Sequence, residues 1–295
     1  MKKLLVTGSS GFLGWHLCQL AKQEWEVSGT YFSHSLEITG INLLKVNLTN
    51  FQQIQQIFSE IQPTAVIHTA ALSQPNFCQT HSDESHAINV IASYNIAGLC
   101  ADYSIPCVFT STDLVFDGLN APYKETDPVS PVNIYGEQKV LAEEGMLERY
   151  PLTAVCRMPL MFGMATPTAT SFIQSFIQTL KEGKELNLFI DEFRTPVSGK
   201  TAAKGLLLAL EKEIYGRIHL GGKERISRYD FGRLLVEVFQ LPANQLKACR
   251  QQDVKMAAPR PSDVSLNSSK AFALGYEPPS ILEELNVVFF NADAD

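Results

Sequence analysis

The chain has 295 residues, 45% of them hydrophobic and 19% charged, with a net charge of −7 and a pI of about 5.4. This composition predicts a folded protein with a large core, and the acidic balance argues against binding to nucleic acids or anionic membranes. Gly8 and Gly11 interrupt the first apolar stretch, and no apolar run reaches the ~20 residues of a membrane helix, so neither a signal peptide nor a membrane span is expected. We therefore expect a cytoplasmic protein.

The cysteines argue against metal and disulfide chemistry. No two of them are spaced as C-x-x-C, so the sequence predicts neither a zinc site nor a redox pair, and we expect no metal. Most stand among apolar residues, which favours free, buried thiols in a reducing compartment. The six are Cys18, Cys78, Cys100, Cys107, Cys156 and Cys249.

Short apolar runs alternate with amphipathic segments through the first half of the chain. Such alternation predicts a parallel sheet covered by helices on both faces and joined by right-handed crossovers. The expected fold is therefore α/β, with a doubly wound parallel sheet of the Rossmann type. The runs predicted as strands are 3–7, 26–31, 43–48, 65–71, 107–112 and 152–157, and the predicted helices are 12–23, 51–61, 83–103 and 132–148.

The pattern is looser in the second half. Helices are predicted over 171–182, 201–212 and 228–240, a strand over 216–220, and proline-containing loops near 260 and 278. We predict a dinucleotide-binding domain at 1–162, to which 201–222 returns. A smaller, mainly C-terminal substrate lobe would consist of 163–200 and 223–295.

A glycine-rich turn joins the first predicted strand to the first helix. Gly8 permits a tight turn, Gly11 lets the backbone approach a pyrophosphate, and Gly14 lets the helix pack closely on the sheet. The spacing is G-x-x-G-x-x-G, and the alternative is a connection that needs flexible residues and binds nothing. We expect cofactor contacts from Gly8, Ser10, Gly11, Phe12, Leu13 and Gly14.

Tyr135 is followed four residues later by Lys139, and in a helix such residues share one face. A tyrosine has a pKa of ~10, and a neighbouring cation lowers it, so this pair could protonate a carbonyl oxygen while hydride reaches its carbon. The ammonium could also bind a cofactor ribose. A hydroxyl of Ser111 or Thr112, at the end of the fifth predicted strand, could orient the carbonyl. The alternative is that Tyr135 and Lys139 lie on an ordinary, half-exposed face of the helix, with Lys139 in water.

These features together resemble the extended short-chain dehydrogenase/reductase family over the whole chain. The strings Thr110–Gly118, Pro122–Glu125 and Pro131–Lys139 are similar to its dTDP-4-dehydrorhamnose reductase branch. A regulatory subunit of methionine adenosyltransferase, not chiefly known for catalysis, shares the same pattern. The resemblance implies that Thr112, Tyr135 and Lys139 are the catalytic residues.

The resemblance also implies roles for residues elsewhere in the chain. Asn89 matches a structural asparagine or is simply a polar residue inside a helix. The implied cofactor contacts are Ala70, Ala71, Asn47 (where the family has Asp) and Leu48, and the implied substrate contacts are Ser111, Asp113, Arg157, Arg194 and Arg260. The arginines could make paired bonds to a diphosphate or be ordinary surface cations.

The end of the second predicted strand bears on the choice of cofactor. No acidic residue stands there to hold the ribose 2′-hydroxyl, while Ser33, His34 and Ser35 could bind a 2′-phosphate. We expect NADP(H) to be preferred, with NAD(H) as the alternative.

The activity expected is reduction of the 4-keto group of a nucleotide-linked deoxysugar. Leu114 departs from the reductase branch, which carries Tyr there, and from the dehydratases, which carry Glu. The substrate therefore stays open, and a dehydratase is disfavoured. The alternatives are an epimerase acting on a similar substrate and a non-catalytic regulatory subunit of the same fold. A homodimer is conceivable.

Overall fold

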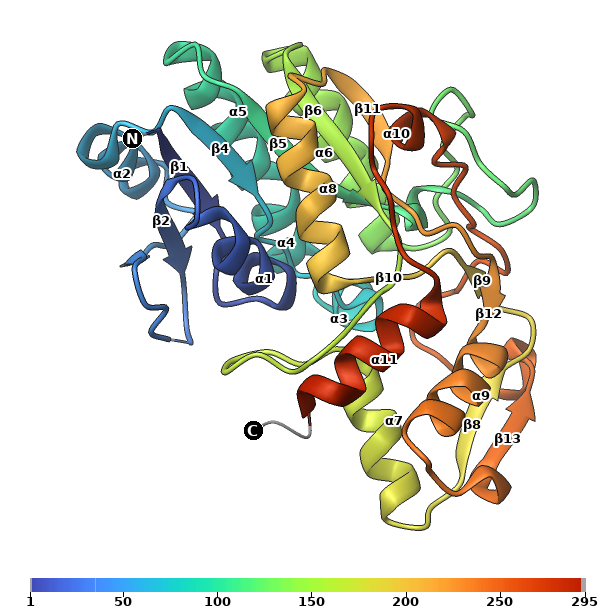
Figure 1. The fold of residues 1–295 in the computed structure, drawn as a ribbon. Helices are drawn as coiled ribbons and strands as arrows, with labels where there is room; N and C mark the ends of the chain where they lie inside the picture. The colour runs from blue at the N-terminus through green and yellow to red at the C-terminus, as the bar shows by residue number, and fades with distance from the viewer. Residues whose placement is uncertain (1, 35, 293–295) are drawn as a thin grey trace.

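The computed structural model describes residues 2–34 and 36–292, and a seven-stranded sheet forms its centre (Figure 1). The strands are β1 (Lys3–Thr7), β2 (Glu26–Tyr31), β3 (Asn42–Lys45), β4 (Ala65–His68), β5 (Cys107–Thr112), β6 (Thr153–Met158) and β11 (Gly216–His219). They lie in the order β3-β2-β1-β4-β5-β6-β11, and every neighbouring pair is parallel. The predicted doubly wound α/β fold is confirmed.

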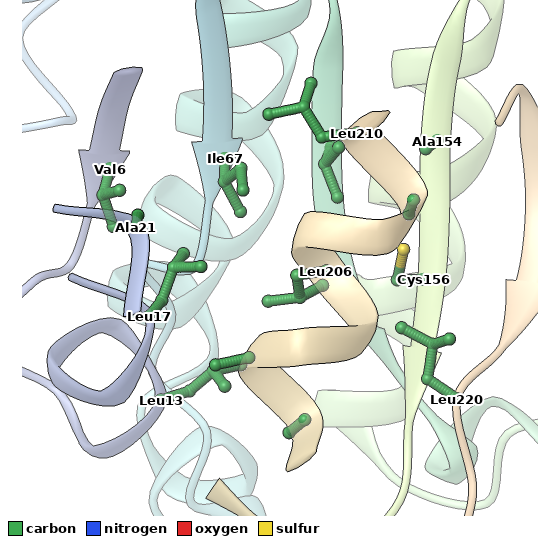
Figure 2. Packing of buried hydrophobic residues seen from close by; sticks show 14 of the residues in the cluster. Val6, Leu13, Leu17, Ala21, Ile67, Ala154, Cys156, Leu206, Leu210 and Leu220 are labelled. Carbon is green, nitrogen blue, oxygen red and sulfur yellow. The ribbon is translucent and has the colours of Figure 1, made fainter. Parts of the chain in front are cut away.

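Helices bury both faces of this sheet. Leu4 and Val6 of β1 belong to a cluster with residues of α1 and α8, part of which Figure 2 shows, Val6 with Ala21 and Leu17 of α1 and Leu206 of α8 among them. Leu5 points the other way, into a second cluster with α2, α5 and α6. Burial on both faces explains why the strands are continuous apolar runs. These helices are α1 (Phe12–Ala21), α2 (Phe51–Ile61), α5 (Ala92–Asp102), α6 (Ile134–Arg149) and α8 (Gly199–Glu211).

The helix predicted over 83–103 contains a wider turn. α4 (Ser82–His86) leads into a π-helical turn at Ala87–Ile91 before α5 begins. Asn89 lies in this turn, where its side chain bonds the backbone N–H (2.9 Å) and carbonyl (3.1 Å) of Leu72 and the Gln138 side chain (2.9 Å). The asparagine therefore ties the loop after β4 to α6, which supports its structural role.

Most of the remaining elements, among them α7, β8, α9, α11 and β13, lie at the lower right of Figure 1, beyond the carboxyl ends of the strands. They include three small sheets: β7 pairs with β10 and β8 with β13 in parallel, and β9 pairs with β12 antiparallel. Their bounds are α3 (Pro75–Thr80), β7 (Met161–Phe162), α7 (Phe172–Lys181), β8 (Leu186–Phe189), β9 (Phe193–Arg194), β10 (Val197–Ser198), β12 (Ile226–Ser227), α9 (Arg228–Val238), β13 (Leu246–Cys249), α10 (Ser269–Ala273) and α11 (Ile281–Ala292).

The C-terminal helix α11, of 12 residues, was not predicted from the sequence. Its buried residues Ile281, Leu285 and Val288 are spaced i, i+4, i+7, a pattern that could have predicted it. The buried carboxylate of Glu284 accepts hydrogen bonds from the backbone N–H (2.8 Å) and hydroxyl (2.7 Å) of Ser198. The helix thus fastens the C-terminal segment to the start of α8.

All six cysteines are free thiols, five of them buried and Cys249 half-buried. In the described ranges, 2–34 and 36–292, none of the helices combines the length and the apolar character needed to cross a bilayer.

Candidate active site

The carboxyl ends of four neighbouring strands open into a cavity of about 630 Å³. The glycine-rich turn follows β1, Ala71 follows β4, Thr112 ends β5 and Met158 ends β6. This is the edge at which open α/β sheets bind ligands. The remaining lining comes from α6 and from the C-terminal elements, so the cavity joins the two halves of the chain.

The glycine-rich turn leaves no room for a side chain at Gly8 or Gly14. Gly8 has φ +72°, and a Cβ on it would lie 2.7 Å from Ala70 Cα; a Cβ on Gly14 would lie 2.2 Å from the Gly8 carbonyl oxygen. At the N-terminus of α1, Gly11 provides no side-chain cap and the first turn has no acidic residue. The free N–H groups there suit the pyrophosphate of a dinucleotide cofactor.

Tyr135 and Lys139 are buried side chains of α6 that line the cavity. Lys139 Nζ lies 4.1 Å from the Phe109 ring centroid and has no hydrogen-bond or carboxylate partner in the described part of the chain. Burial lowers the pKa of Lys139 to about 7.

The pKa of Tyr135 differs from the expectation. We expected Lys139 to lower it, but burial raises it well above its usual value, and the nearby Cys78 and Asp113 raise it further. The phenol is therefore protonated at neutral pH, which is the state that a proton donor needs.

Thr112 links Tyr135 to an acidic residue. The Thr112 side chain lies close enough to Tyr135 to oppose the rise in the pKa of Tyr135. The Thr112 hydroxyl accepts from the Leu114 N–H (3.2 Å) and donates to Asp113 Oδ1 (3.2 Å). Burial raises the pKa of Asp113, although Arg194 opposes that shift. Thr112 thus lies between the phenol and a buried carboxylate, as a group that orients a substrate oxygen would.

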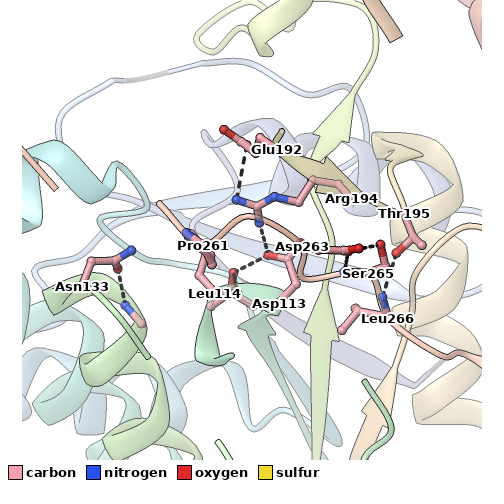
Figure 3. Close-up of polar contacts among 12 residues, drawn as sticks. Asp113, Leu114, Asn133, Glu192, Arg194, Thr195, Pro261, Asp263, Ser265 and Leu266 are labelled. Atoms are coloured by element: carbon pink, nitrogen blue, oxygen red, sulfur yellow. Dashed lines mark hydrogen bonds and ion pairs between the residues drawn. The ribbon is translucent and has the colours of Figure 1, made fainter. Parts of the chain in front are cut away.

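Three arginines belong to the polar lining contributed by the C-terminal elements. Arg194 Nη1 donates to Asp113 Oδ1 (2.7 Å) and its Nη2 approaches Glu192 Oε1 (3.5 Å), as Figure 3 shows. Arg228 Nε donates to the same Glu192 oxygen (3.2 Å), and Arg260 bonds the Ala258 carbonyl (3.2 Å) and Asn76 (3.2 Å). We call Arg194, Arg228, Arg260 and Glu192 the arginine cluster.

Arg228 and Glu192 had no role in the sequence analysis. Arg228 is the first residue of α9, and only its place after Ser227, which caps that helix, could be anticipated from the sequence. Phe172 of α7 is a further cavity-lining residue that was missed.

Of two further expected substrate contacts, Ser111 lines the cavity and Arg157 does not. Arg157 is 1% exposed and pairs in bidentate fashion with Glu143, through Nε (2.9 Å) and Nη2 (2.8 Å), so it lies inside the protein and does not line the cavity. Ser111 lines the cavity, and its hydroxyl donates to Glu143 Oε1 (2.6 Å). Both side chains donate hydrogen bonds to the buried carboxylate of Glu143.

The other expected residues fall into two groups. Lining the cavity are Gly8, Gly11, Phe12, Leu13, Gly14, Ala71, Thr112, Asp113, Tyr135, Lys139, Arg194 and Arg260. Outside its lining are Ser10, whose carbonyl accepts from the Thr168 hydroxyl (2.8 Å), and Ala70, which packs on Gly8. The exposed Ser33 and His34 follow β2, and Asn47 and Leu48 follow β3, at the same edge of the sheet. Ser35 lies outside the described residues.

Similar proteins include enzymes and a subunit of an enzyme. The bovine (Bos taurus) methionine adenosyltransferase 2 subunit beta is 28% identical over 281 residues, which are 93% of this chain and 83% of that protein. A probable low-salt glycan biosynthesis reductase of Haloferax volcanii is 29% identical over 95% of both chains.

Solved structures show the same fold. That of a hypothetical dTDP-4-dehydrorhamnose reductase from Sulfolobus tokodaii is 32% identical, with a TM-score of 0.84 over 95% of this chain and 98% of that one. A dTDP-4-dehydrorhamnose reductase from Bacillus anthracis, in complex with NADP, has a TM-score of 0.88 at 24% identity over 99% and 100% of the two chains. The family described as the RmlD substrate binding domain matches residues 1–291. The chain therefore belongs to the RmlD substrate binding domain family.

Proposed function

We propose that the protein reduces the 4-keto group of a nucleotide-linked deoxysugar with NADPH. The observation that carries this proposal is the position of the Thr112–Tyr135 pair, which lines the same cavity as the glycine-rich turn and the arginine cluster. A nicotinamide cofactor supplies a hydride when bound. In this proposal residues 1–162 and 201–222 hold the cofactor, and 163–200 and 223–295 hold most of the substrate.

The roles of the side chains follow from their protonation states. Tyr135, kept neutral by burial, donates its phenolic proton to the oxygen of the reduced carbonyl. The Thr112 hydroxyl orients that oxygen. The Lys139 ammonium, with a pKa near 7, binds a cofactor ribose and stabilises the phenolate left after proton transfer.

The glycine-rich turn and the ends of β2 and β3 would hold the dinucleotide. Gly8, Ser10, Gly11, Phe12, Leu13 and Gly14 would contact its pyrophosphate, Ser33 and His34 its 2′-phosphate, and Asn47, Leu48, Ala70 and Ala71 its adenine side and nicotinamide ribose. The sequence has no carboxylate among residues 32–36, directly after β2, and this supports NADPH. NADH binding tenfold more tightly than NADPH would contradict this part of the proposal.

The decisive experiment is steady-state oxidation of NADPH and NADH with a panel of keto-sugar nucleotides that includes dTDP-4-dehydrorhamnose. The proposal expects turnover with at least one of them.

A second candidate is supported by the similarity to methionine adenosyltransferase 2 subunit beta. In that case the protein would bind a cofactor and act as a subunit of another enzyme. Cofactor binding without consumption of NADPH on any keto-sugar nucleotide would favour it over the reductase.

A further inference from the structure

Tyr135 stands in the first turn of its helix, where a helix is held least firmly. α6 begins at Ile134, so Tyr135 is its second residue. The first N–H groups of a helix have no carbonyl partner within the helix and depend on groups outside it. Two side chains provide such groups: Asn133 Oδ1 accepts from the Gly136 N–H (2.9 Å), and Gln79 Oε1 accepts from the Ile134 N–H (3.2 Å). The position of the phenol therefore depends in part on these two side chains.

Asn133 also bonds the C-terminal part of the chain. Its amide nitrogen Nδ2 donates to the Pro259 carbonyl (3.0 Å), 126 residues later in the sequence. The amide group of an asparagine carries a donor and an acceptor at one end, so a single side chain holds both the start of α6 and Pro259. Because Asn133 is buried, water does not compete for either hydrogen bond.

The segment that contains Pro259 has a second attachment. Asn76 Oδ1, in α3, accepts from the Ala258 N–H (3.1 Å) and from Arg260 Nη2 (3.2 Å). Ala258 is fully buried, and Arg260 lines the cavity. We call residues 258–260 the bridge, because their hydrogen bonds join the C-terminal part of the chain to α3 and to the start of α6.

The first turn of α6 also packs against the residues that orient the substrate oxygen in the proposed reaction. A Cβ on Gly136 would lie 2.3 Å from the Leu114 carbonyl oxygen. The Leu114 N–H in turn donates to the Thr112 hydroxyl (3.2 Å). Because protein interiors are closely packed, a shift of this turn would change the position of Tyr135 relative to Thr112. Proton transfer is sensitive to such displacements, since misplacement by about 1 Å can cost a hundredfold in rate.

We propose that Asn133 is a positioning residue that couples the bridge to Tyr135. A ligand in the cavity that holds the bridge in place would, through Asn133, hold the first turn of α6 in the geometry that proton transfer needs. The coupling is reciprocal, so whatever loosens the first turn also loosens the bridge. Asn133 does not touch the reacting atoms in this proposal. The inference rests on the proposed function.

The substitution Asn133→Asp separates this coupling from capping of the helix. A carboxylate caps a helix about as well as an amide does, so it still accepts from the Gly136 N–H. It has no hydrogen to donate to the Pro259 carbonyl, and the two oxygens repel each other. Asn133→Ser also keeps a capping oxygen, adds no charge, and ends one atom short of the amide nitrogen. The matched control is Asn50→Asp, since the exposed Asn50 caps α2 through the Gln53 N–H (3.2 Å).

The first measurement does not need turnover. Hydrogen exchange of two backbone amides is followed by NMR in protein saturated with NADP⁺: the Ala258 amide reports on the bridge, and the Gly136 amide reports on the first turn of α6. In the wild type we expect dTDP to slow the exchange of both. In Asn133→Asp and Asn133→Ser the Ala258 amide should exchange about tenfold faster, because one hydrogen bond is lost, and dTDP should no longer slow the Gly136 amide. Asn50→Asp should match the wild type at both amides.

The second measurement is kinetic. Both variants of Asn133 should lower kcat on a keto-sugar nucleotide by about tenfold, while the Tm and the dissociation constant for NADPH stay as in Asn50→Asp. A residue that only caps the helix would leave kcat unchanged in these variants, because both keep the cap.

Three results would overturn the proposal: wild-type exchange of the Ala258 amide in both variants of Asn133, exchange in the wild type that dTDP does not slow, or slowing of the Gly136 amide by dTDP that persists in both variants. Wild-type kcat in variants whose coupling is lost would reject the role of Asn133 and leave the reductase standing. If the exchange results are as expected and the wild type reduces no keto-sugar nucleotide, the coupling stands and the reductase is rejected. If Asn133→Asp does not fold, Asn133→Ser decides.

Discussion

Lys139 and the arginine cluster both bring positive charge to one cavity, but the structure holds that charge in opposite ways. Lys139 Nζ lies over the Phe109 ring, no carboxylate of residues 2–34 and 36–292 pairs with it, and burial lowers its pKa to about 7. Arg194 and Arg228 are paired with Glu192, and Arg194 also with Asp113. A charge that can be lost near neutral pH suits proton transfer, whereas a permanent, positioned charge suits binding.

The largest effect is expected at the proton-transfer side of this comparison. Tyr135→Phe removes the phenolic proton while keeping the ring, so kcat should fall by ~10²–10⁴, the usual contribution of a general acid. The dissociation constant for NADPH should stay unchanged. Steady-state kinetics and fluorescence titration check both, with the exposed Tyr103→Phe as a control. A variant that keeps more than half of the wild-type activity would remove Tyr135 from the mechanism.

Arg157 pairs with a buried carboxylate and does not line the cavity, in contrast to the arginine cluster. Arg157→Met leaves Glu143 buried without its bidentate partner, which should lower the free energy of unfolding by about 3–5 kcal/mol. Arg217 also contacts Glu143 (3.1 Å) but is 37% exposed, so Arg217→Met should have a much smaller effect. Urea unfolding measures both. A fully stable Arg157→Met variant with impaired substrate binding would restore the substrate role expected from sequence.

The shifted pKa of Lys139 predicts a pH dependence of stability. The unfolded lysine titrates near ~10.4 and the folded one near 7, so between these values the unfolded chain binds the extra proton and rising pH favours the folded state. Relative to Lys139→Met, the wild type should gain ~1.4 kcal/mol of unfolding free energy per pH unit above about pH 7. Below that pH the difference should be constant. Urea unfolding of the cofactor-free proteins tests this. If the difference in unfolding free energy between the wild type and Lys139→Met stays constant up to about pH 9, the pKa of Lys139 is not lowered.

The smallest effect concerns Leu114, which lines the cavity and packs with Cys78 and Tyr135. Leu114→Tyr adds one hydroxyl near the sugar, and a hydrogen bond contributes roughly 0.5–1.5 kcal/mol. The KM for dTDP-4-dehydrorhamnose should therefore fall by at most about tenfold, with little change in kcat. Leu114→Phe is the matched control for size. If both variants behave alike, the hydroxyl does not reach the substrate.

The parts that sequence predicted correctly are those fixed by neighbours along the chain. The glycine spacing, the apolar strands and the i, i+4 relation of Tyr135 and Lys139 are all local, and each is present in the structure. Arg228 could not be anticipated, because its environment depends on Glu192, 36 residues earlier, through the β9–β12 pairing. Arg157 lies inside the protein because it pairs with Glu143, and the sequence does not reveal which face of a doubly buried strand meets such a partner. The expected catalytic residues Thr112, Tyr135 and Lys139 all line the cavity, and their roles stay predictions.

The β9–β12 ladder has a consequence for redesign. Residues 192–194 and 226–228 hold one another in register through backbone hydrogen bonds, while the chain between them forms β10, α8 and β11. Loops in that interval can therefore lengthen or shorten without separating Glu192 from Arg228. The two short segments should be exchanged together when ligand preference is transplanted between relatives, because replacing either alone would leave an unmatched charge across the ladder.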